Sequence, residues 1–139
     1  MPINIVNQNP SQKIPSGLLR KCLQKISVAL DLKNQDINFQ FVSDREIRRT
    51  NKKYLHHDYA TDVLAFEMKE KGVLGDIMIS SETARRQACE QKHSYLKELK
   101  ILAIHGWLHL LGYRDKKKKD AQCMWKKTNE LLLLMENLE

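Results

Sequence analysis

Two histidines have the residue type and the spacing to bind a divalent metal ion. His105 and His109 are four residues apart in the apolar stretch "HGWLHLLGYRD", residues 105–115. On an α-helix, residues i and i+4 lie on the same face, so both imidazoles would be directed at one point. Buried imidazoles need polar partners, and two of them repel each other when both are charged. A divalent cation between them would meet both requirements.

Asp115 is the candidate for a third ligand. Gly112 follows the apolar run and predicts the left-handed turn that commonly ends a helix. That turn would let Asp115 approach the two imidazoles from outside the helix. Two histidines and one aspartate leave a coordination position open for water, which is typical of catalytic rather than structural zinc. We therefore predict one zinc ion, or another divalent transition metal. The alternative is a pair of core histidines that bond to other polar groups.

The residue after the first histidine argues against one class of enzyme. Zinc proteases of the H-E-x-x-H type carry their general base, a glutamate, at this position. Here the position is occupied by Gly106. Hydrolysis of peptides is therefore a poor match, although a metal hydrolase acting on another substrate stays open.

Several sequence blocks resemble one family. "HGWLHLLGYRD" (105–115) is similar to the H-G-x-L-H-L-x-G-Y-D-H signature of the YbeY proteins. "TDVLAF" (61–66), "LGDIMIS" (74–80) and "NKKY" (51–54) resemble further blocks of that family, in the same order and spacing. The resemblance spans most of the chain. It implies a metal-dependent endoribonuclease, specific for single strands, that acts in the maturation of ribosomal RNA.

The chain departs from the family pattern at two functional positions. Asp115 stands where the family has a third histidine, and Leu55 stands where it usually has an arginine thought to contact the scissile phosphate. The candidates to take over this catalytic contact are Arg114, His57 and Arg48. For His57 the alternative is an ordinary polar turn before a strand.

The charge of the chain favours a polyanionic partner. Its 139 residues contain 24 Lys and Arg against 17 Asp and Glu, a formal net charge of +7. We expect the basic segment 45–53 and the lysine run 116–119 to border the metal cleft and to hold RNA phosphates. Ribosomal RNA is the expected partner, with small-subunit ribosomal proteins as further candidates. The loss of the family arginine also favours an alternative function, a ribosome assembly factor whose metal is structural.

The predicted elements show how these residues are positioned. Apolar residues at helical spacing predict the helix at 16–30, and alternating apolar residues predict the strand at 37–42, whereas capping residues mark the starts of the helices at 43 and 81. We predict an α+β fold in one domain, residues 1–139, with a small mixed sheet and a central helix that carries the metal ligands. The expected strands are 3–7, 37–42, 62–68 and 75–80, and the expected helices are 16–30, 43–55, 81–92, 95–111 and 117–138.

Compartment and membrane signals point the same way. The three cysteines, Cys22, Cys89 and Cys123, are far apart in the sequence and form no C-x-x-C motif. The first residues lack a basic segment followed by an apolar one, as a secretory signal would require. No apolar run approaches the roughly 20 residues that span a membrane. We expect a cytoplasmic protein with no membrane partner.

Overall fold

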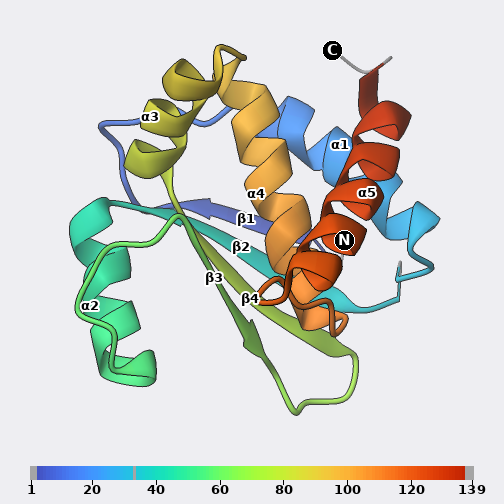
Figure 1. Ribbon diagram of the computed structural model, residues 1–139, viewed down its shortest axis with the longest axis horizontal. Helices are drawn as coiled ribbons and strands as arrows, with labels where there is room; N and C mark the ends of the chain where they lie inside the picture. The colour runs from blue at the N-terminus through green and yellow to red at the C-terminus, as the bar shows by residue number, and fades with distance from the viewer. Residues whose placement is uncertain (1–2, 33, 137–139) are drawn as a thin grey trace.

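The strands and helices follow one another along the chain in the predicted order. The computed structural model describes residues 3–32 and 34–136, and in this part of the chain four strands and five helices form an α+β fold (Figure 1). The observed bounds differ from the predicted ones by two residues or fewer, except that the end predicted for the last helix lies outside the described residues. The elements are β1 Ile3–Asn7, α1 Ser16–Ala29, β2 Asp36–Val42, α2 Asp44–Leu55, β3 Val63–Glu67, β4 Val73–Ser80, α3 Ser81–Gln91, α4 Tyr95–Leu110 and α5 Lys118–Met135.

The sheet is mixed, with strand order β1-β2-β4-β3. β1, β2 and β4 are parallel, whereas β3 pairs with β4 in the antiparallel direction and forms one edge. The register places Asn4 beside Asn38, Asn38 beside Asp76 and Asp76 beside Phe66. The mixed sheet confirms the predicted fold class.

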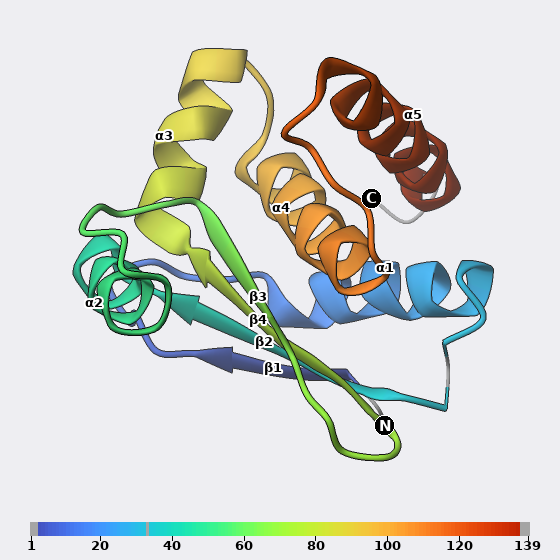
Figure 2. The ribbon, with the colours of Figure 1, turned by 60° about the horizontal axis from the view of Figure 1, so that its bottom comes forward.

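Helices cover the two faces of the sheet unequally. The main core joins Phe39, Ile77 and Ile79 of the sheet to buried residues of α1, α4 and α5. α4 lies between the sheet and α5 (Figure 2). On the opposite face, Ile47 of α2 packs in a smaller cluster that includes Leu64 of β3. α2 is therefore separated from α4 by the sheet.

α4 is the central helix, and it approaches the sheet closely because of one glycine. A Cβ atom at Gly106 would meet Cγ2 of Ile77 at 2.7 Å, which is closer than real Cβ atoms come. The next residue, Trp107, is buried and meets the ring of Phe39 edge-on at a centroid distance of 5.6 Å. Position 106 therefore faces the sheet, where a glutamate would not fit, and the two histidines flank this contact.

The membrane prediction concerns helix length and polarity. Across the described ranges, none of the helices is long and apolar enough to cross a bilayer.

Candidate metal centre

His105 carries a ring nitrogen with no hydrogen-bond partner. Its Nε2 atom is buried and unbonded within the part of the chain that the structure describes. Its ring meets the Trp125 ring edge-on, with centroids 4.9 Å apart. Burial lowers the pKa of His105, and the neighbouring His109 adds to the effect, while Asp62 and Asp115 act in the opposite direction. The neutral imidazole is the form that binds a metal.

His109 is held in an orientation that suits a ligand. Its Nδ1 lies 3.2 Å from the backbone carbonyl oxygen of Tyr113, and a carbonyl can only accept, so Nδ1 donates. Its Nε2 lies 3.5 Å from Oδ2 of Asp115. With the proton on Nδ1, the neutral ring has a lone pair on Nε2, which would face the negative carboxylate of Asp115. A second proton on Nε2, or a cation between the two atoms, would remove this repulsion. A metal-binding histidine commonly donates its other N–H to a carbonyl in this way.

The turn after α4 brings Asp115 back to the helix. Gly112 has φ of +99°, a left-handed conformation that glycine adopts without strain. The Gly112 amide donates to the His109 carbonyl at 3.1 Å, and the Tyr113 amide donates to the Leu108 carbonyl at 3.0 Å. These bonds close the helix end and reverse the chain. The predicted glycine turn is confirmed, and it places the Asp115 carboxylate beside His109.

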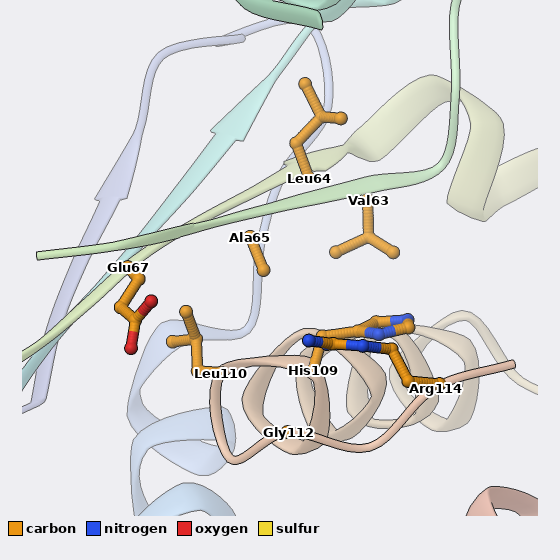
Figure 3. A pocket seen from close by; sticks show the side chains of 8 residues that line it. All are labelled: Val63, Leu64, Ala65, Glu67, His109, Leu110, Gly112 and Arg114. Carbon is orange, nitrogen blue, oxygen red and sulfur yellow. The ribbon is translucent and has the colours of Figure 1, made fainter. Parts of the chain in front are cut away.

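A cavity of about 380 Å³ opens next to His109 between β3 and the end of α4. Its walls include residues of β3 on one side and Arg114 on the other. In Figure 3, Val63 and Ala65 point from β3 toward α4, whereas Leu64 points away to the opposite face. Arg114 extends from the loop after α4 to the same wall of the cavity as His109 (Figure 3). Glu67 also lines the cavity, so an anion would bind at the end where Arg114 and His109 lie together (Figure 3).

The chemical types of the three candidate ligands suit a divalent ion, and the structure brings two of the three together. His109 and Asp115 face each other, and His105 lies one helical turn earlier with an unbonded nitrogen. In residues 3–32 and 34–136, however, no three His, Cys, Asp or Glu side chains are close enough to one point to form a metal site. Two imidazole nitrogens and a carboxylate oxygen are suitable ligands for zinc. Their convergence on one ion stays a prediction.

The other predicted catalytic residues lie in a different part of the molecule. Arg48 donates from Nε to Oδ1 of Asp58 at 2.9 Å, and Lys52 lies 3.8 Å from Oδ2 of the same carboxylate. The hydrogen bond from Arg48 lowers the pKa of Asp58. His57 stacks on Tyr59, with centroids 5.4 Å apart and an interplanar angle of 13°. These residues belong to α2 and the loop after it, and their observed partners are each other rather than the α4 histidines.

The two basic segments do not flank the candidate site equally. The lysine run 116–119 directly follows Asp115 and continues into the start of α5. The basic segment 45–53 lies in α2, which packs on the face of the sheet opposite α4. The expectation that both segments border one cleft is therefore wrong for α2, because the sheet separates it from α4.

Three residues near His105 were not identified as site residues from the sequence. Asp62, Gln87 and Trp125 line a second cavity together with His105. Nε2 of Gln87 lies 3.3 Å from Oδ2 of Asp62 and donates to it. Asp62 stands in the block "TDVLAF", which could have identified it. Gln87 and Trp125 belong to no motif, so only the packing of α3 and α5 near α4 reveals them.

Comparison with known proteins gives consistent results. A family model described as "Endoribonuclease YbeY" matches residues 4–136. A protein of the same description from Syntrophus aciditrophicus is 38% identical over 144 residues, which cover 97% of this chain and 90% of the relative. Its counterpart from Aquifex aeolicus is 40% identical, covering 86% of this chain and 81% of the relative. The solution structure of TM1509 from Thermotoga maritima superposes with a TM-score of 0.69 at 29% identity, covering 96% of this chain and 88% of the other.

Proposed function

This chain belongs to the YbeY family, and on that premise we propose that it is a metal-dependent endoribonuclease that cleaves single-stranded RNA. The observation that carries the proposal is the pairing of His109 with the Asp115 carboxylate beside the unbonded Nε2 of His105. This group adjoins a cavity that Arg114 also lines. Ribosomal RNA is the proposed substrate and the cytoplasm the proposed location.

His105, His109 and Asp115 are the proposed ligands of one zinc ion. When bound, such an ion polarises a phosphate oxygen and makes deprotonated water available near neutral pH. The protein's part is to hold the ligands in place. The Tyr113 carbonyl fixes the His109 ring, and the turn at Gly112 sets the position of Asp115. Burial lowers the pKa of His105 and so favours its neutral form, whose nitrogen lone pair is free to bind.

Arg114 is the proposed contact to the scissile phosphate. Its guanidinium group lies at the cavity wall beside His109, and a guanidinium can hold two phosphate oxygens at once. This role would replace the family arginine, whose position is taken by Leu55 at the exposed end of α2. Arg48 and His57 stay candidates for contacts to more distant parts of the RNA.

Binding of the RNA backbone would depend on charge rather than base sequence. The lysines at 116–119 follow Asp115 and are exposed, so they can neutralise phosphates next to the cavity. RNA structure, or a small-subunit ribosomal protein, would then select the cleavage position. Leu55 favours one alternative, an assembly factor that binds RNA without cutting it.

The test compares the purified wild-type protein with His109→Ala. Each is stripped of metal, reloaded with zinc, manganese, nickel or magnesium, and mixed with end-labelled ribosomal RNA fragments in single-stranded and duplex form. We expect metal-dependent cleavage of single strands by the wild type, and no cleavage by the variant. RNA binding without cleavage under every metal would support the assembly-factor alternative and contradict the proposed activity.

A further inference from the structure

A second cavity, of about 250 Å³, lies at His105, one helical turn before His109 on α4. Asp62 lines it from the loop just before β3, Gln87 and Glu90 from α3, and Trp125 from α5. Pockets of roughly 300–1,000 Å³ hold drug-sized ligands. This cavity is slightly smaller, which suits one planar ring system and excludes a longer ligand.

Trp125 gives the cavity an aromatic wall that is open to solvent. Its side chain is 48% exposed, whereas the other tryptophan, Trp107, is 1% exposed and part of the core. The His105 ring meets it at an interplanar angle of 86°, so the imidazole does not stack face to face on the indole. An exposed indole beside a polar cavity is a typical platform on which a nucleobase stacks.

The charge of the cavity determines which part of a nucleotide can enter. Its lining includes the carboxylates of Asp62, Glu90 and Glu98 and, among the residues the structure describes, no lysine or arginine. Glu98 is already bonded to His93 at 2.6 Å. Carboxylates repel a phosphate but accept hydrogen bonds from the amino groups of bases. The cavity beside His109 contains one carboxylate, Glu67, together with the guanidinium of Arg114, and the phosphate would lie at Arg114.

We propose that the cavity formed by Asp62, Gln87, Glu90 and Trp125 is a nucleobase pocket that selects bases bearing an amino group, namely adenine, cytosine and guanine, over uracil. The base stacks on Trp125, and its amino group donates to the carboxylate of Asp62 or Glu90. Uracil has no amino group, and its one N–H donor, at N3, lies between two carbonyl oxygens that a carboxylate repels, so uracil pairs less well with these acceptors. The inference rests on the proposed function for its biological meaning, because the base would flank the phosphate held at Arg114.

The test uses tryptophan fluorescence of the full chain without added metal or RNA. Only two tryptophans are present, and Trp107 is buried, so a ligand that stacks in the pocket should quench Trp125 alone. Adenosine, cytidine, guanosine and uridine are titrated separately, with excitation at the red edge of the indole band, where nucleosides absorb little. Trp125→Phe keeps an aromatic ring and removes the reporter, so quenching should disappear in that variant.

We expect saturable quenching by the three amino-bearing nucleosides and about fivefold weaker binding of uridine, because uridine has no amino group to donate to a carboxylate of the pocket. Glu90→Gln should reduce this discrimination, whereas Glu70→Gln, an exposed substitution in the turn between β3 and β4, should not. Equal quenching by all four nucleosides, no quenching, or quenching that persists in Trp125→Phe would overturn the proposal.

A small organic cation is the competing occupant of this pocket, because acidic and aromatic groups together also bind such ions. Quenching by tetramethylammonium but by no nucleoside would overturn the proposal and assign the pocket to a cation. The fluorescence measurement does not depend on cleavage. Failure of RNA cleavage with nucleoside binding intact would therefore contradict the proposed function alone, and the reverse result would contradict the nucleobase pocket alone.

Discussion

The end of α4 and the end of α2 contain the same kinds of residue in very different states. Each has a histidine, an aspartate and an arginine within about two helical turns of the helix end. At α2, Arg48 and Lys52 pair with Asp58, and His57 stacks on Tyr59, all on the exposed surface. At α4, the carboxylate of Asp115 faces an imidazole beside a cavity, and the nearby Nε2 of His105 is unbonded within the described chain.

The difference shows why residue type alone does not identify a site. The charged groups at the end of α2 pair with one another, although Oδ1 of Asn51 in the same helix is also buried and unbonded within the described residues. At α4, the buried Nε2 of His105 has no hydrogen-bond partner within the described chain. Such an atom costs free energy unless a ligand bonds to it. The comparison therefore predicts that substitutions at α4 affect metal binding and cleavage, whereas matched substitutions at α2 do not.

The largest effect is expected for the histidine of each region. In metal sites, loss of a group that only hydrogen-bonds to a ligand lowers metal affinity or activity about 10–100-fold. His109→Ala removes a proposed ligand itself, so it should lower RNA cleavage and zinc affinity at least about 100-fold. His57→Ala should change both by less than about twofold, because its ring contacts only surface groups. Zinc content by mass spectrometry and cleavage rates measure the two effects. Equal losses in both variants would remove the distinction between the regions.

The next largest effect is expected for Asp115, the carboxylate of the α4 region. Asp115→Ala should weaken zinc binding by at least about tenfold, because two imidazoles alone hold the ion poorly. Asp115→His should retain zinc, since it restores the ligand type of the family. Asp58→Ala is the matched control at α2 and should leave zinc binding unchanged. Full zinc occupancy and normal cleavage in Asp115→Ala would show that this aspartate is not a ligand.

The arginines test the proposed phosphate contact. Arg114→Ala should lower cleavage about tenfold with zinc content unchanged, because a charge-assisted hydrogen bond to a phosphate is lost. Arg48→Ala should lower it by less than about twofold, since its observed partner is Asp58. Steady-state kinetics on a short labelled RNA measure both effects. A larger loss in Arg48→Ala would transfer the catalytic contact to α2 and reverse the comparison.

The smallest effect concerns the residues that end the two helices. His56 ends α2 with φ of 60°, a left-handed conformation that glycine adopts more readily than a residue with a Cβ atom. His56→Gly should therefore raise the free energy of unfolding by up to about 1 kcal/mol in urea denaturation, with cleavage unchanged. Gly112→Ala, after α4, should lower stability by about 1 kcal/mol or more and also weaken zinc binding, because the turn positions Asp115. Reduced cleavage in His56→Gly would show that the α2 end has a role beyond structure.

Local patterns were sufficient to predict the secondary structure and the helix end at the candidate site. Hydrophobic periodicity and capping residues predicted the strands and helices that the described residues form, because both signals come from residues near one another in the sequence. The spacing of His105 and His109 placed them on one helix face, and Gly112 predicted the turn that returns Asp115 to His109. These features depend on residues close together in the sequence.

Tertiary packing decided the rest, because it depends on which faces of distant elements meet. The sequence could not show that the sheet separates the basic helix α2 from α4, since helix position relative to the sheet is set by the whole core. It also could not bring Gln87 of α3 and Trp125 of α5 to the cavity at His105. The types of the candidate ligands were determined by the sequence alone. The cavities beside them, and the unbonded nitrogen of His105, arise only when helices that are far apart in the sequence pack together.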